Sequence, residues 1–136
     1  MKNLGCQPLE REEQEGVIDF MYQGQHFVAV THNQTILVDL YYFDWHVSSL
    51  DDIDNLARLR KVINEVNQLQ AVTSYYDIRE DVNIMAVCSK REVLFLDDIP
   101  NVLDYLHFIF RSFFDARMHV ETELAKQNKS AEEDVN

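Results

Sequence analysis

The sequence predicts a single α+β domain: a five-stranded antiparallel sheet with two long helices packed on one of its faces. Residues 16–47 are rich in β-branched and aromatic side chains, and short turn-forming gaps interrupt them, which is typical of strands joined as hairpins. Two later segments have apolar residues at spacings of three and four, as on one face of a helix. Residues 71–88, between these segments, return to strand composition. The predicted element order is therefore β-β-β-α-β-β-α.

The two ends of the chain are polar. Residues 1–15 carry four glutamates between positions 10 and 15 and few apolar side chains. Such a segment buries too little surface to offset its ordering entropy, so we expect a frayed tail or a short exposed N-terminal helix. Residues 127–136 form an acidic tail that we expect to be disordered. The α+β domain is expected to span residues 16–126.

The first half of the domain is predicted to be a three-stranded meander over 17–22, 26–32 and 35–45. Side chains alternate between the two faces of a strand. In the third strand, Val38, Leu40 and Tyr42 therefore share the face that meets the helices. Leu37, Tyr41 and Phe43 must then point the other way, and Trp45 is expected to join them.

The second half is predicted to be a helix, a hairpin and a last helix. Ser49 opens a capping-box pattern for a helix over about 50–69. The hairpin strands are 71–78 and 82–88, with a break or bulge at 89–92 and a short extension after it. Asp97-Asp98 and Pro100 indicate the start of a helix over about 99–126. Its side chains predicted to be buried against the sheet are Leu106, Ile109, Phe110 and Phe113.

Charge and hydropathy exclude several classes of protein. Twelve basic and twenty-four acidic residues give a net charge of −12. This charge repels phosphate backbones and anionic lipid, so we expect no nucleic-acid and no membrane partner. Apolar runs are too short to span a bilayer, and no signal peptide is recognisable. We therefore expect a cytoplasmic location.

No pattern in the sequence points to catalysis. Cys6 and Cys88 are interpreted as free thiols, and their spacing matches no zinc site. Asp115 and His119 have the i, i+4 spacing of a metal-binding pair, but this spacing recurs by chance in many helices and we interpret it as a surface ion pair. Neither a nucleophile elbow nor a glycine-rich phosphate loop occurs. We assign no catalytic, cofactor-binding or metal-binding residue and expect no cofactor.

Residues 62–67, Val-Ile-Asn-Glu-Val-Asn, match the hydrophobic-Asn-x-x-Asn signature of the YbjN family. Residues 98–101 and the apolar segment 103–114 also resemble that family, and the resemblance spans about 16–125. It implies a fold similar to that of type III secretion chaperones. It also implies a non-catalytic, often dimeric protein of the chaperone or sensory-transduction regulator type. Independently of the resemblance, asparagines at a helix end commonly bond the last carbonyls or the following strand.

These observations favour a non-enzymatic protein-interaction module, chaperone-like or regulatory, that binds an unidentified protein through its sheet face or edge. The binding residues predicted are Leu37, Tyr41, Phe43 and Trp45. We expect a homodimer, because a two-fold pair is the commonest way to cover such a face. Two alternatives remain. Residues 1–15 or the tail could cover that face, or a pocket between sheet and helices could serve a small ligand or a small enzyme.

Overall fold

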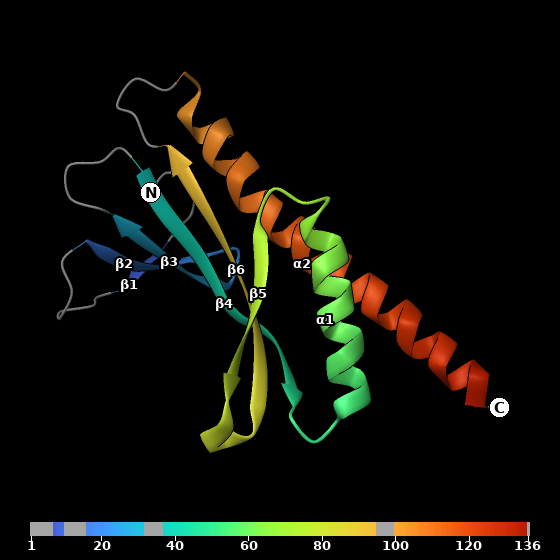
Figure 1. The fold of residues 1–136 in the computed structure, drawn as a ribbon. Coiled ribbons are helices and arrows are strands. Elements are labelled where there is room, and N and C mark those ends of the chain that lie inside the picture. The colour runs from blue at the N-terminus through green and yellow to red at the C-terminus, as the bar shows by residue number, and fades with distance from the viewer. Residues whose placement is uncertain (1–6, 10–15, 32–36, 95–99, 136) are drawn as a thin grey trace.

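The computed structural model describes residues 7–9, 16–31, 37–94 and 100–135, and it has the predicted α+β architecture (Figure 1). All neighbouring strands are antiparallel, in the order β1-β2-β3-β4-β6-β5. The five long strands are those predicted, and a three-residue strand at the N-terminal side adds a sixth. The strands are β1 (Gln7–Leu9), β2 (Val17–Tyr22), β3 (Gln25–Thr31), β4 (Leu37–Ser49), β5 (Thr73–Arg79) and β6 (Ile84–Leu94).

Helices α1 (Ile53–Asn67) and α2 (Val102–Val135) cover one face of this sheet. Figure 1 shows α2 running diagonally past the strands and α1 beside β5, which forms one edge of the sheet. Side chains of both helices join those of the strands in one apolar core. Phe110 of α2, for example, packs edge-to-face on Phe20 and Phe27 of the sheet. The four α2 side chains predicted to be buried are buried: Leu106, Ile109, Phe110 and Phe113.

The ends of the chain differ from the expectations. Residues 7–9 pair with β2 as a strand, so they are not part of an N-terminal helix. The tail expected to be disordered over 127–136 instead continues α2 as far as Val135. No glycine or proline interrupts that segment, so the helix simply propagates through polar residues. The remaining residues of the 1–15 segment lie outside the described residues.

The helix starts also differ from the predicted ones. Asp52, not Ser49, caps α1, and its carboxylate accepts a hydrogen bond from the Asn55 backbone N–H at 3.1 Å. Ser49 Oγ instead accepts from the Asp51 N–H. Helix α2 begins at Val102, directly after a left-handed residue, and the aspartates predicted to cap it lie outside the described residues.

A β-bulge in β4 overturns the prediction for Trp45. The register between β4 and β6 shifts between Tyr42 and His46, and Asp44 has a left-handed φ of 55°. Residues 43–45 of β4 lie opposite Cys88 alone, and these extra residues break the strict alternation of side chains at Trp45. Trp45 therefore points toward the helices, where it is 7% exposed and its Nε1–H donates to Ser89 Oγ at 3.1 Å. The break expected at 89–92 is absent, because β6 pairs continuously there.

Candidate functional site

The face of the sheet opposite the helices carries a pair of stacked aromatic rings. Tyr41 and Phe43 lie two residues apart on β4, with their ring centroids 5.2 Å apart and their planes 9° from parallel. Phe43 is 39% exposed, and Tyr41 is half-buried. Lys90 of β6, which pairs with Tyr41 in the register, places its ammonium 6.0 Å from the Tyr41 ring centroid. We call Tyr41, Phe43 and Lys90 the aromatic face.

The structure brings together only part of the predicted set. Leu37 shares the face of Tyr41 but lies at the start of β4, opposite Leu94 of β6. Trp45 is on the other face and belongs to the core. Lys90 was not predicted, because it approaches Tyr41 only through the long-range pairing of β4 and β6, and Tyr75 of β5 also lies near Tyr41. No local pattern marks such neighbours.

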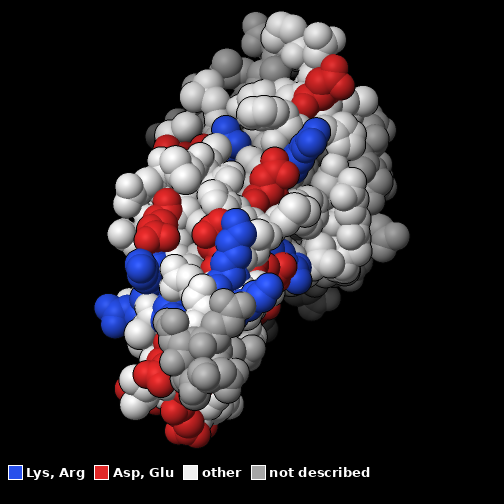
Figure 2. Space-filling model, turned by 90° about the vertical axis from the view of Figure 1, so that its right-hand side faces the viewer, with Lys and Arg blue, Asp and Glu red and all other residues white. Residues whose placement is uncertain are grey.

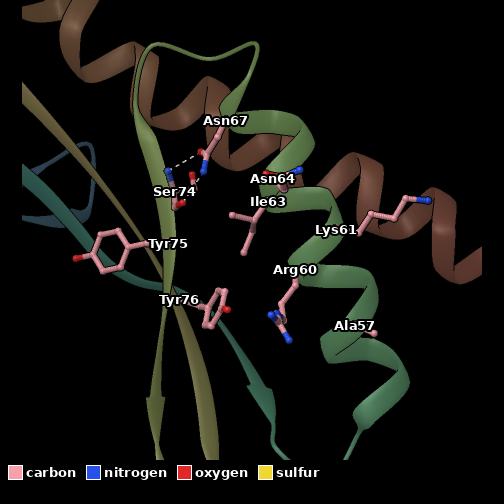
Figure 3. A pocket seen from close by; sticks show the side chains of 9 residues that line it. All are labelled: Ala57, Arg60, Lys61, Ile63, Asn64, Asn67, Ser74, Tyr75 and Tyr76. Atoms are coloured by element: carbon pink, nitrogen blue, oxygen red, sulfur yellow. Dashed lines mark hydrogen bonds between the residues drawn. The ribbon is translucent and has the colours of Figure 1, made fainter.

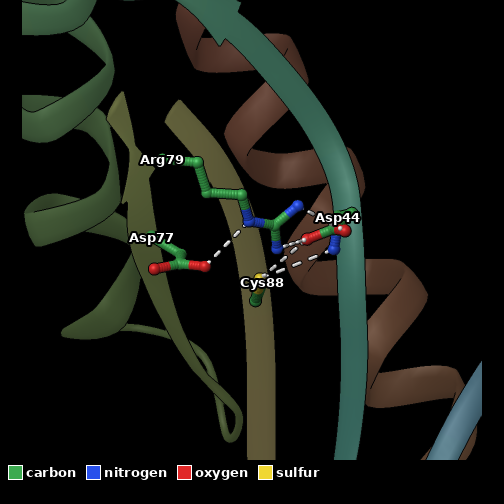
Figure 4. Close-up of polar contacts among 4 residues, drawn as sticks. All are labelled: Asp44, Asp77, Arg79 and Cys88. Carbon is green, nitrogen blue, oxygen red and sulfur yellow. Dashed lines mark hydrogen bonds and ion pairs between the residues drawn. The ribbon is translucent and has the colours of Figure 1, made fainter. Parts of the chain in front are cut away.

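A charged cluster borders the aromatic face at the bulge (Figure 4). Arg79 of β5 reaches across β6 and binds both carboxylate oxygens of Asp44, at 2.7 and 3.0 Å. Its Nε–H also donates to Asp77 at 3.0 Å. The hydrogen bonds from Arg79 are the main reason that the pKa of Asp44 is lowered. A bidentate pair of this kind holds its partners in one geometry, so the cluster fixes the bulged residue.

Cys88 lies beneath this cluster and does not have the surroundings of an activated nucleophile. Its thiol is 1% exposed and donates to Asp44 Oδ1 at 3.5 Å. Burial is the main cause that raises the pKa of Cys88. The reactive form of cysteine is the thiolate, which this environment disfavours. The geometry therefore supports a structural thiol, and Cys6 lies outside the described residues.

Asp115 and His119 of α2, which have the spacing of a metal-binding pair, each contact another residue. Asp115 lies 4.0 Å from Arg111, one turn earlier on the helix. His119 Nδ1 instead contacts the side-chain amide of Gln70, which follows α1, at 3.0 Å. Within residues 7–9, 16–31, 37–94 and 100–135, no three His, Cys, Asp or Glu side chains gather in a geometry that could hold a metal ion.

An open groove of about 720 Å³ separates α1 from the edge strand β5 (Figure 3). Arg60 of α1 places its guanidinium 5.6 Å from the centroid of the Tyr76 ring. At one end, Asn67 accepts from the Ser74 N–H at 2.8 Å and donates to the Ser74 carbonyl at 2.9 Å. The interpretation that an asparagine at this helix end bonds the following strand is therefore confirmed for Asn67. The groove is lined by Ala57, Arg60, Lys61, Ile63, Asn64, Asn67, Ser74, Tyr75 and Tyr76.

A second cavity, of about 160 Å³, lies between the sheet and α2. It is bounded on one side by Leu106 and Phe110 of α2 and on the other by apolar residues of β2, β3, β4 and β6. Thr31 is the single hydroxyl-bearing residue among its described lining residues. A cavity of this kind accepts an apolar group but offers no set of converging polar groups for catalysis.

Neither α1 nor α2, the two long helices of the described chain, combines the length and the apolar character needed to cross a membrane. No protein-family model matches the chain, and no curated protein matches it. The crystal structure of an uncharacterized protein from Methanothermobacter thermautotrophicus is similar in fold, with a TM-score of 0.56. The two share 13% sequence identity, and the match covers 88% of this chain and 86% of the other. This similarity concerns the fold alone.

Proposed function

We propose that this protein is a non-enzymatic interaction module that binds a protein partner through its aromatic face, with a second copy of the chain as the first partner. The observation that carries this proposal is the stacked, partly exposed pair of Tyr41 and Phe43 on a sheet face that neither helix covers. Rigid aromatic side chains bury a large area for little loss of conformational freedom. For this reason aromatic residues are enriched in the centres of protein interfaces.

The surroundings of the aromatic pair have the character of an interface rim. Lys90 lies on one side of Tyr41, and the Asp44–Arg79 ion pair lies at the bulge beyond Phe43. Apolar side chains continue along the same strand, since Val47 is 52% exposed. An apolar centre with charged groups at its border is the usual anatomy of a specific contact. A two-fold contact would place these groups opposite their copies.

The charge of the chain predicts how such a dimer responds to salt. Each copy carries a net charge of −12, so two copies repel each other over distances comparable with the screening length. The contact itself is apolar and aromatic, and salt weakens it little. Association is therefore expected to become tighter as ionic strength rises, which is the opposite of what a charge-driven contact would do.

The alternative of a small enzyme with a pocket between sheet and helices receives less support. The cavity in that position is lined almost wholly by apolar side chains, and Cys88 is held in its unreactive form. A cytoplasmic location and a chaperone-like or regulatory role belong to the same proposal as the interaction itself. They rest on the composition of the chain and on its resemblance to the YbjN family.

Sedimentation velocity of the wild type and of the Tyr41→Glu and Phe43→Glu variants tests this proposal. The wild type is expected to be dimeric at micromolar concentration, and each variant monomeric, because an ionised carboxylate is costly to bury without a partner. Phe108→Glu is the matched control. Phe108 is a 65% exposed phenylalanine on α2, on the opposite side of the sheet, and its replacement should leave the dimer intact.

Two results would contradict the proposal. One is a wild type that stays monomeric up to about 100 µM at every ionic strength, since specific dimers associate well below this concentration. The other is a dimer that dissociates equally in Phe108→Glu and in Phe43→Glu. Circular dichroism of each variant separates loss of the dimer from loss of the fold.

A further inference from the structure

The edge strand β5 presents main-chain groups that no other strand among the described residues pairs. In an antiparallel sheet, a residue directs its N–H and its C=O toward the same neighbour, and successive residues alternate. Asn67 binds both main-chain groups of Ser74, so these point away from β6. Tyr76 and Ile78 must then point the same way as Ser74. Asn67 therefore occupies the edge at Ser74, while the main-chain N–H and C=O groups of Tyr76 and Ile78 are open for hydrogen bonding.

The open edge faces the α1–β5 groove. Both Tyr75 and Tyr76 line the groove although they lie on opposite faces of β5, which places the groove along the strand's edge. Ile78 is 52% exposed at its far end. An exposed strand edge with an exposed isoleucine is a site of strand pairing unless charge or a cover protects it. Asn67 covers this edge at Ser74.

The groove carries positive charge on a strongly acidic protein. Arg60 and Lys61 are its charged lining residues, and it has no acidic one. Both belong to α1, which holds three of the chain's twelve basic residues and two acidic ones. Figure 2 shows the side of the molecule that bears α1, with basic side chains gathered among acidic ones. The charge of the groove therefore complements an acidic ligand.

A second copy of the chain is a poor occupant of this edge. If two β5 strands paired about a two-fold axis and used both open positions, Tyr76 would lie opposite Ile78 of the other copy. Asp77 would then lie opposite the other Asp77, at the short distance of a pair without mutual hydrogen bonds. Like charges in that arrangement destabilise the pairing. Shifting the register would bring in Ser74, whose main chain Asn67 already occupies.

We infer that the edge of β5 and the α1–β5 groove bind an extended acidic segment of another protein, which adds to the sheet as a further strand. The main chain of that segment pairs with Tyr76 and Ile78, and its carboxylates lie against Arg60 and Lys61. This mode combines main-chain hydrogen bonds for affinity with side-chain contacts for selectivity. The site is separate from the aromatic face and does not depend on it.

Fluorescence anisotropy with two sets of labelled octapeptides tests the inference. One set has glutamate and the other lysine at alternate positions, with randomised apolar or β-branched residues between them. The glutamate set is expected to bind and the lysine set not. Binding should weaken as salt rises, because screening reduces the attraction of the two basic residues. The double variant Arg60→Glu/Lys61→Glu should bind on the order of tenfold more weakly or worse.

Backbone pairing has its own readout. The amide hydrogens of Tyr76 and Ile78 should exchange more slowly when the glutamate peptides are bound. Ile78→Pro removes one of these donors on the side away from β6 and should abolish binding. Ile78→Thr keeps the backbone N–H and should bind the peptides as the wild type does. Comparing the two variants therefore separates the loss of the backbone hydrogen bond from the loss of the isoleucine side chain.

Two control variants change residues outside the α1–β5 groove. Arg111→Glu changes an equally basic, highly exposed residue of α2 outside the groove and should leave peptide binding unchanged. Phe43→Glu should also leave it unchanged, so this inference and the proposed dimer fail or hold separately. Three results would overturn the inference: no binding of any glutamate peptide, equal binding of the lysine set, or protection of Tyr76 and Ile78 by self-association alone.

Discussion

Replacing Phe113 by alanine tests the assignment of the buried face of α2, on which the whole architecture depends. Phe113 is fully buried, and its ring packs edge-to-face on Phe27 of β3, with centroids 5.5 Å apart and an interplanar angle of 80°. The substitution therefore removes a large side chain at the point where α2 meets the sheet. The neighbouring rings are held by strands and cannot fully close the space.

The expected loss follows from three contributions. Transferring a buried phenylalanine side chain out of the core costs about 1.5–3 kcal/mol. The lost edge-to-face contact with Phe27 contributes about 0.5–1.5 kcal/mol. The cavity left behind adds the rest, so the free energy of unfolding should fall by about 3–5 kcal/mol, as for buried aromatic residues in general. Phe113→Leu fills most of the space and should cost less than half as much.

Urea denaturation followed by circular dichroism measures this difference, provided that the slope with denaturant is unchanged. Phe108→Ala, five residues earlier on the same helix, is the control, because its side chain is 65% exposed. It should change the free energy of unfolding by less than about 1 kcal/mol. A loss below about 1 kcal/mol for Phe113→Ala, or equal losses for both variants, would mean that the buried face of α2 is assigned wrongly.

Two further predictions concern Asn67 and His46. Asn67→Ala removes two hydrogen bonds to the Ser74 main chain and should lower the free energy of unfolding by about 1–3 kcal/mol. Asn64→Ala, at an exposed position on the same helix, should cost less than about 0.5 kcal/mol, and equal losses would contradict the role given to Asn67. Burial lowers the pKa of His46 below 6.5, so the unfolded chain binds the proton first as pH falls. Stability should therefore decrease below about pH 6.5, and His46→Gln should flatten that decrease, whereas an unchanged slope between pH 7 and 5 would show that His46 does not cause it.

The periodicity of apolar residues predicted the core well. Phe20 and Tyr22 of β2, and Leu40 and Tyr42 of β4, face the helices as their alternation indicates. The apolar stripe on α2 was predicted equally well, because apolar residues spaced three or four positions apart lie on one side of a helix. These are local patterns, and the burial that they predict is their direct consequence.

The sequence predicted the candidate sites less well than the core. Trp45 was placed on the wrong face because strict alternation was assumed through Asp44, and nothing in the residue types at 43–45 marks a bulge. The α1–β5 groove was not predicted at all. Its residues come from two elements, and the sequence indicated Asn64 and Asn67 only as residues at a helix end.

The sequence by itself determined the types of the five long strands and the two helices and the side of most of these elements that is buried, since these depend on spacing along the chain and on the residue types of each segment. The tertiary structure alone decided that β6 lies inside the sheet and β5 at its edge. It also decided that the bulge turns Trp45 into the core and that Lys90 meets Tyr41. Each of these results depends on which strands pair and in which register, and pairing energies between segments far apart in sequence leave no mark in the pattern of either segment.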